Sequence, residues 1–245
     1  MKRLLAIPLA TLLASQAHAA GIAAPFNIAS ASAAAGSTTL AMTTTAACPA
    51  GSLIEIFASQ IANGNPVSVA DSAGNTYTGL VTTQLTGSVA KQRFLVAGGR
   101  ANAGLANGGT ITVTYSGTIG VKLEVADCIL GTAIIGTALD ANPTGNVGSS
   151  TSPTISTSTL ISPAEIVFCG YTLTTGSGVS FTPTSGFTAL TAVSNVAAIQ
   201  WEYEIVSAST AVTCAPTLGT TQVWGADANS FIQTQTNQML QGVGQ

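Results

Sequence analysis

Short runs of alternating apolar and polar residues follow one another along the chain. The clearest is TITVTYSG at 110–117, which places Ile111, Val113 and Tyr115 on one face and threonines on the other. A period of two is expected of a strand with one buried face. About a dozen such runs, separated by turn signals, and no convincing 3.6-residue period predict an all-β fold. We expect an antiparallel, jelly-roll-like β-sandwich.

The first residues, MKRLLAIPLATLLASQAHAAG, carry the three parts of an export signal in order. Lys2 and Arg3 are the basic start, residues 4–14 are apolar, and Ala17-His18-Ala19 is a cleavage site. Residues 1–19 are therefore predicted to be a signal peptide. An uncleaved anchor or an internal virion segment is the alternative. No later apolar run approaches the roughly 20 residues that a membrane span needs.

The remaining chain divides by composition. Residues 20–36 are small and non-periodic and are predicted to be a flexible lead-in, residues 37–232 a single sandwich, and residues 233–245 a polar tail. Residues 136–154 are rich in Gly, Ser, Asn, Thr and Pro and are expected to form a long surface loop. That loop could also link two small domains, although neither half repeats the other.

Charge is scarce, at 6% of residues, against roughly 25% in ordinary soluble domains. Because 46% of residues are apolar, the chain is not of the disordered class. Its surface must therefore be hydrated through hydroxyls and amides and not through charges. Such surfaces are typical of extracellular sheet proteins and of subunits that pack into assemblies. The net charge of −3 becomes −5 without Lys2 and Arg3. No basic patch remains, which argues against nucleic acid as a partner.

Four cysteines, all beyond the leader, indicate whether the protein resides in an oxidising compartment. They are Cys48, Cys128, Cys169 and Cys214. In an oxidising compartment they predict two disulfides, with three pairings open. Buried free thiols are the alternative. Their spacing contains no C-x-x-C metal motif.

Ordinary catalytic constellations are mostly excluded, because the single histidine, His18, lies in the leader. Without histidine there is no Ser-His-Asp or Cys-His system and no His-based metal site. We predict no metal and no cofactor. Glu202 and Glu204 are two residues apart on a strand, which separates them by roughly 6 to 7 Å. That distance is within the range between the two catalytic carboxyls of glycosidases. A solvated pair is the commoner arrangement. Glu124 and Asp127 are expected to be one solvated and one strand-end acid.

Four aromatic residues could stack on sugars if their rings are exposed. They are Trp201, Tyr203, Trp224 and Tyr171. Core packing is the alternative, since they lie inside strand patterns.

The loop DSAGNTYTG, beginning at Asp71, has one acid and one amide, Asn75, and too little charge for tight calcium binding. A type I turn accounts for each residue, with Gly74 at positive φ. The flanking strands would then pair as a hairpin. If Asp71 binds a ligand, a second acid must come from elsewhere, first Asp227 or Asp140.

The order of these segments resembles a recurrent β-sandwich domain of secreted bacterial proteins and of phage tail and fibre proteins, which has no assigned activity. The resemblance covers about residues 52–232. Its most specific element is the stretch 71–77, followed by the alternating strand at 110–115. It implies a jelly-roll-like sandwich with a binding or structural role, and supplies no catalytic residues.

These observations predict a secreted, non-enzymatic sandwich that acts in surface binding or assembly, as an adhesin-like or glycan-binding module. A virion component (capsid-decorating, fibre or tail protein) is the alternative, and a glycoside hydrolase using Glu202 and Glu204 is the third. The expected partner is a surface glycan or another protein subunit, copies of the chain included. The expected location is outside the cell or on its surface, or else in a virion.

Overall fold

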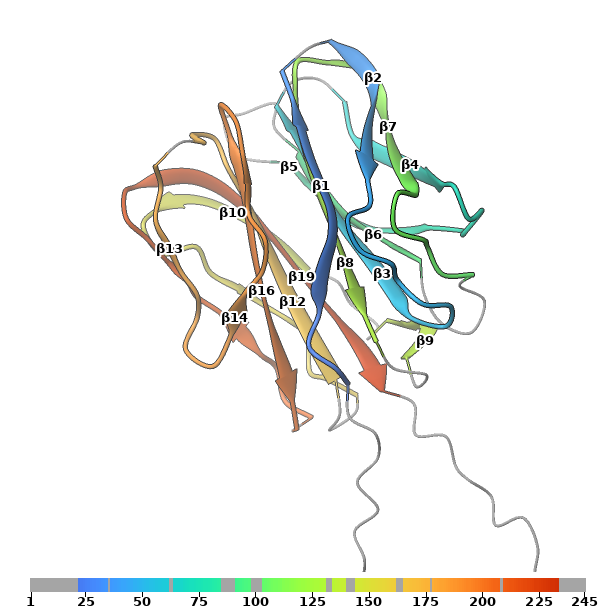
Figure 1. The fold of residues 1–245 in the computed structure, drawn as a ribbon. Helices are drawn as coiled ribbons and strands as arrows, with labels where there is room; N and C mark the ends of the chain where they lie inside the picture. The colour runs from blue at the N-terminus through green and yellow to red at the C-terminus, as the bar shows by residue number, and fades with distance from the viewer. Residues whose placement is uncertain are drawn as a thin grey trace, which may run out of the picture.

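The computed structural model describes residues 22–34, 36–61, 64–84, 91–97, 103–130, 134–139, 144–161, 165–176, 178–207 and 209–233. Within these ranges the secondary structure consists of antiparallel strands, which confirms the all-β sandwich (Figure 1). The predicted signal peptide and residues 234–245 of the predicted tail lie outside the described residues. No helix of the described residues is long and apolar enough to cross a membrane.

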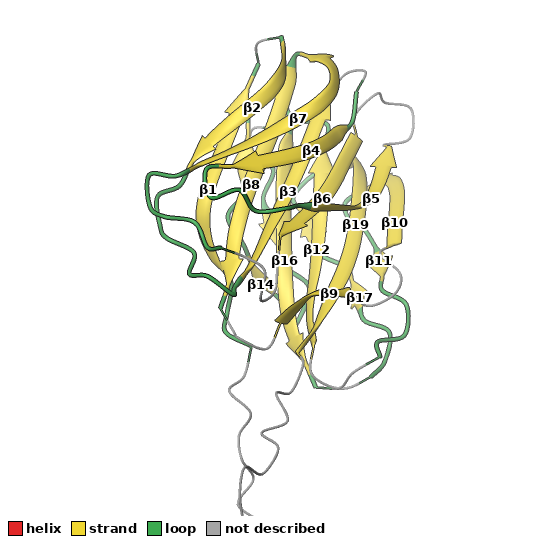
Figure 2. Ribbon diagram, turned by 90° about the vertical axis from the view of Figure 1, so that its right-hand side faces the viewer, coloured by secondary structure: helices red, strands yellow, loops and turns green. Residues whose placement is uncertain are grey.

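Two sheets come from the first half of the chain. The central sheet has the order β1 (Phe26–Ala33), β8 (Val121–Ile129), β3 (Leu53–Ile61), β6 (Lys91–Ala97), β5 (Thr78–Gln84). The outer sheet has the order β2 (Ser37–Thr43), β7 (Thr110–Ile119), β4 (Pro66–Asp71). Figure 2 shows β2, β7 and β4 side by side.

The second half forms the C-terminal sheet. Its order is β10 (Thr144–Ser150), β19 (Gln222–Gln233), β12 (Glu165–Leu173), β16 (Ala198–Val206), β14 (Thr188–Ala189), with β15 (Val193–Ser194) on β16 and β9 (Ile134–Leu139) on β19. Two short ladders accompany it: β11 (Ile155–Ser156) with β17 (Thr213–Cys214), and β13 (Phe181–Thr182) with β18 (Thr217–Leu218). Every described strand pairing stays within residues 26–129 or within residues 134–233.

Three apolar cores hold these layers together. The shared core lies between the central and C-terminal sheets, where the rings of Phe57 and Trp201 stack with centroids 6.3 Å apart. A second core, with Ile56 and Val113, fills the space between the central and outer sheets. The third, with Tyr171, lies on the other face of the C-terminal sheet. Each half thus builds its own sheets, and the halves meet through the shared core.

Strand alternation decides which side chains are buried. On β7, Ile111, Val113 and Tyr115 are buried and the threonines between them are exposed or half-buried, as the sequence pattern predicted. The stronger runs on β3 and β12 are buried on both faces, because each of those strands has a layer on either side.

Two segments expected to be irregular are strands instead. The predicted lead-in at 20–36 contains β1, which pairs with β8 and buries Ile28 completely. The predicted surface loop at 136–154 contains β10 and part of β9. On β10, Gly148 lies opposite Trp224, whose indole ring would collide with any side chain there. Most residues of both edge strands are small, so the alternating apolar signal of a strand is weak in the sequence.

Two disulfides are present, as predicted, and the structure assigns their pairing. Cys48 is joined to Cys128 on β8, and Cys169 on β12 is joined to Cys214 on β17. The first links the central sheet to the segment that follows β2. The second links the C-terminal sheet to the segments on its outer face.

Candidate functional site

The loop that begins at Asp71 is a turn built around the Asp71 carboxylate. The Asp71 carboxylate accepts hydrogen bonds from the backbone amides of Ala73 (2.9 Å) and Asn75 (3.1 Å). It also accepts one from the Asn75 side chain and one from the Tyr77 hydroxyl, each at 2.8 Å. Gly74 adopts φ 76°, which confirms the predicted turn. With four donors on two oxygens, Asp71 has its acceptor capacity committed to the fold.

The hairpin prediction around this turn is wrong. β4 pairs with β7 of the outer sheet, whereas β5 pairs with β6 of the central sheet. The Asn75 side chain accepts a bond from the Ala103 amide (2.7 Å) and donates one to the Gly104 carbonyl (3.2 Å). These bonds fix the turn to a distant segment, so the chain crosses between sheets there and does not fold back on itself.

Replacing Gly74 by alanine tests this turn. No atom lies within 4 Å of the position that a Cβ would take, so the penalty is that of the left-handed backbone alone. We expect the free energy of unfolding to fall by about 1 kcal/mol in urea titrations. Gly120 is the matched control, since its Cβ would also meet open space and its φ is not left-handed. Equal effects of Gly74→Ala and Gly120→Ala would contradict the turn geometry.

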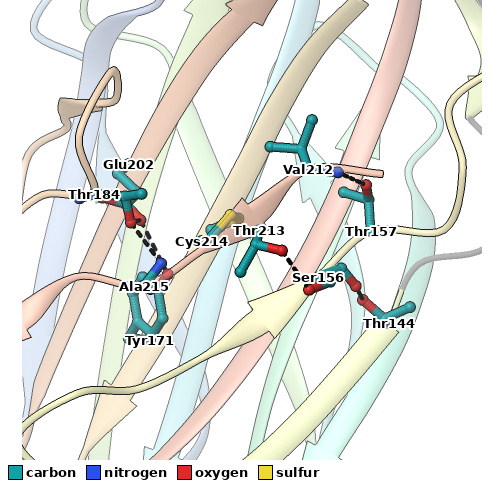
Figure 3. The surroundings of a disulfide bond; sticks show 11 residues. Thr144, Ser156, Thr157, Tyr171, Thr184, Glu202, Val212, Thr213, Cys214 and Ala215 are labelled. Carbon is teal, nitrogen blue, oxygen red and sulfur yellow. Dashed lines mark hydrogen bonds between the residues drawn. A yellow bond between two sulfur atoms is a disulfide. The ribbon is translucent and has the colours of Figure 1, made fainter. Parts of the chain in front are cut away.

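Glu202 anchors a covering segment on the outer face of the C-terminal sheet (Figure 3). It is buried and accepts bonds from the Tyr171 hydroxyl (3.0 Å), the Thr184 hydroxyl (2.7 Å) and the Thr184 amide (2.7 Å). The Thr184 hydroxyl also accepts a bond from the Ala215 amide (2.6 Å). Burial raises the pKa of Glu202, and the bonds from Thr184 and Tyr171 oppose that rise.

This environment differs from the solvated pair that the sequence favoured. Glu202 is enclosed, while Glu204, two residues further along the strand, is half-buried next to Gly186. The expectation failed because the segments after β12 and β16 fold over that face of β16. Both Glu202 oxygens are engaged in bonds that hold this cover, so the carboxyl acts as a structural anchor.

The candidate aromatic platforms are mostly inside the molecule. Trp201 and Tyr171 are fully buried, and Trp224 is 5% exposed. The Trp201 indole donates to the Thr191 carbonyl (3.0 Å), and that of Trp224 donates to the Ser150 hydroxyl (3.1 Å). Tyr203 is half-buried, with its ring 6.4 Å from that of Phe168. The structure therefore places three of the four rings where a sugar could not stack on them.

The acids of β8 are also inside, contrary to expectation. Glu124 and Asp127 are both fully buried, because β8 lies between the outer sheet and the C-terminal sheet. Glu124 accepts a bond from the Tyr115 hydroxyl at 2.7 Å. Burial raises the pKa of Glu124, and it raises the pKa of Asp127 to about 7.

The described residues contain no group of three His, Cys, Asp or Glu side chains that could hold a metal ion. Asp227, proposed as a second acid for Asp71, is on β19 of the C-terminal sheet, with the central sheet between the two. Asp140, the other suggestion, lies outside the described residues. The structure thus does not bring Asp71 and Asp227 into one site.

The outer sheet presents an uncharged, hydroxyl-rich surface, which we call the threonine face. Strand register sets its residues in rows across β2, β7 and β4: Thr39–Thr114–Ser68, Ala41–Thr112–Ala70 and Thr43–Thr110. Thr112 and Thr114 are half-buried and the others are exposed. Apart from Asp71 at the end of β4, the three strands contain no charged residue. The sequence predicted outward threonines on one strand; it did not show that three strands join into one face.

Comparison of the chain with protein-family models, with curated proteins and with solved structures found no match in any of the three. The resemblance to a recurrent β-sandwich domain therefore stays a prediction.

Proposed function

We propose that this protein is a secreted, non-enzymatic module that binds or assembles at a surface through its threonine face. The observation that supports the proposal is the run of small and hydroxyl side chains across β2, β7 and β4. Burying such a face against a partner removes no charge from water, so the large desolvation cost of ions is avoided. Short side chains also lose little rotamer entropy on contact.

An assembly partner fits this face better than a sugar does. Sugar-binding surfaces use exposed aromatic rings, and the rows of the threonine face contain none. A face of hydroxyls suits another sheet-rich protein surface that is equally poor in charge, such as a second copy of the chain. The resemblance to secreted and phage sandwich domains supports the same class of role.

Export is supported by two features. The leader has the three parts of a signal peptide, and the described cysteines are all in disulfides, which persist in oxidising compartments. A non-enzymatic role is supported by the lack of histidine after the leader and by the engagement of Glu202 with Tyr171 and Thr184.

The test places charge on the threonine face without disturbing the core. We expect Thr39→Lys combined with Ala41→Lys to weaken self-association in sedimentation experiments, or binding to cells of the source organism, by at least about tenfold. Both side chains are exposed, so circular dichroism and thermal midpoint should be unchanged. Ser209→Lys, at an exposed position in the second half of the chain, is the matched control.

Two results would count against this proposal. Equal association by the face variant and by Ser209→Lys would move the contact to another surface. Hydrolysis of any member of a glycan panel by the purified chain would favour the glycosidase alternative.

A further inference from the structure

A group of polar side chains interrupts the shared core between the two halves of the chain. Glu55 on β3 and Asp127 on β8 are directly opposite each other in the central sheet, and both are fully buried. Each lies two residues from a member of the shared core on the same strand, Glu55 from Phe57 and Asp127 from Val125, and so shares its face of the sheet. Both carboxyls therefore point toward the C-terminal sheet. Asn229 on β19 is the polar residue that approaches from that sheet.

The hydrogen bonds of this group are incomplete. The Asn27 side-chain amide donates to Asp127 Oδ1 at 3.0 Å and to the Ala126 carbonyl at 3.1 Å. Asp127 Oδ2 and both oxygens of Glu55 are buried without a hydrogen-bond partner, and the Asn229 amide does not reach bonding geometry with them. Two facing carboxyls with three unsatisfied oxygens cannot both be ionised in an apolar core at modest cost.

Arg93 and Lys122, two cations of the central sheet, do not compensate for this pair. Arg93 on β6 donates to the Pro66 carbonyl, and Lys122 on β8 donates to the Ser37 carbonyl, both in the outer sheet. Both side chains therefore lie on the opposite face of the central sheet from Glu55.

The other titratable groups on the pair's side come from the C-terminal sheet, where Asp227 shares a face of β19 with Asn229 and Tyr203 lies at the edge of the core. Among the described strands packed against Glu55, β1 contributes Asn27, β6 contributes Gln92, and β12 contributes Thr172. None of these groups is a cation.

We propose that Glu55 and Asp127 share a proton that keeps the two halves of the chain packed together, and that losing this proton at alkaline pH loosens their contact. A protonated carboxyl can donate a hydrogen bond to its ionised neighbour, so one proton satisfies two groups at once. The second ionisation would place like charges side by side between the sheets. The pair is thus a pH-sensitive clasp at the contact between residues 22–130 and residues 134–233.

The direction of the effect follows from the acids themselves. Burial raises the pKa of Glu55 well above its ordinary value; the approach of Asn229 opposes that rise and the charge of Asp127 adds to it. Burial likewise raises the pKa of Asp127 to about 7, against the opposing effect of the bond from Asn27. In the unfolded chain both carboxyls titrate at about pH 4. Native protein therefore holds protons that unfolded protein has lost. The stabilisation is complete below about pH 4 and is lost as the pH rises through the native pKa values.

The experiment compares unfolding by urea at about pH 5 and about pH 8.5. We use Trp224→Phe as the background, which leaves Trp201, in the shared core, as the fluorescent reporter. The unfolding equilibrium constant of this background should rise at least about tenfold between the two pH values. Glu55→Gln should remove at least about a tenfold part of that rise, and be more stable than its parent at alkaline pH. Glu204→Gln, on the other face of the C-terminal sheet, is the control.

Asp127→Asn should remove the same part of the rise, and the double variant should remove no more than either single one. If a variant fails to fold, carbon-13 carboxyl shifts of the intact chain answer the same question. A carboxyl carbon-13 chemical shift of Glu55 or Asp127 that still changes with pH above about pH 6 supports the clasp. Titration of both carboxyls that is complete below about pH 5 overturns it. Equal pH dependence of Glu55→Gln and Glu204→Gln also overturns it. So does calcium that stabilises the background, but not Glu55→Gln, at about pH 8.5, because the pair is then a cation site.

Discussion

Replacing Cys48 and Cys128 together by alanine is expected to lower the free energy of unfolding by about 4 kcal/mol. The disulfide closes a loop with a sequence separation of 80 residues, and cross-linking so long a loop removes much of the entropy of the unfolded chain. It also joins β8 to the segment after β2, where the Cys48 amide and carbonyl pair with Leu105 at 2.8 and 2.7 Å. Urea titration of the oxidised protein and the double variant measures the difference.

The same protein under reductant is the control for this prediction, since reduction breaks the loop without removing atoms from the core. Reductant also opens the second disulfide, and the loss measured for Cys169→Ala with Cys214→Ala is subtracted to correct for it. After that correction the two losses of unfolding free energy should agree to within about 1 kcal/mol. A loss below about 1 kcal/mol would show that Cys48 and Cys128 are thiols in the purified protein. Non-reducing mass analysis would then show two hydrogen atoms more than the form with both disulfides.

The positions of the two disulfides bear on how the halves behave. One lies wholly within residues 22–130 and the other wholly within residues 134–233. Each half is therefore cross-linked internally, while within the described chain no disulfide crosses the shared core. The contact between halves depends on packing around Phe57 and Trp201 and on the protonation of Glu55 and Asp127. Loosening at alkaline pH should thus separate two still-ordered halves before either unfolds.

The sequence predicted the strands that have one buried face. On β7 the alternation of Ile111, Val113 and Tyr115 with threonines predicted both the strand and its buried side. The outer sheet packs one of its faces on the central sheet and leaves its other face open to solvent. The sequence prediction failed for β1 and β10, where most residues are small and the few large apolar side chains, Phe26 and Ile28 on β1 and Val147 on β10, are too few to show an alternating pattern.

It also failed where a third layer changes the environment. Glu202, Glu124 and Asp127 have the polar character of outward strand positions, yet each is covered by a segment distant in sequence. Hydrophobic periodicity reports the average burial of a strand face, and it carries no information on which loop returns to cover it. The turn at Asp71 was predictable because its bonds are largely local, from residues 73 to 77. Its bonds to residues 103 and 104 were not.

Replacing Glu202 by alanine is expected to cost about 3 kcal/mol of folding free energy. The change leaves the buried Tyr171 hydroxyl and the Thr184 amide and hydroxyl without their acceptor, and each buried donor left unsatisfied costs roughly 1 kcal/mol or more. Glu202→Gln keeps one carbonyl oxygen and should lose about half as much. Urea titration at neutral pH measures both, with Glu204→Gln as the control on the same strand.

Glu202 should also be coupled to the second disulfide. In the register of β12 and β16 it is opposite Cys169, and Thr184 connects it to Ala215, next to Cys214. The carboxyl and the disulfide thus hold the same covering segment, so losing one should reduce the effect of losing the other. In a double-variant cycle with Cys169→Ala and Cys214→Ala, we expect the combined loss to be smaller than the sum by about 1 kcal/mol or more. Additive losses would mean that Glu202 and the disulfide stabilise separate parts of the structure. A Glu202→Gln variant that keeps its stability but loses a sugar hydrolysis shown by the parent would make the carboxyl catalytic instead.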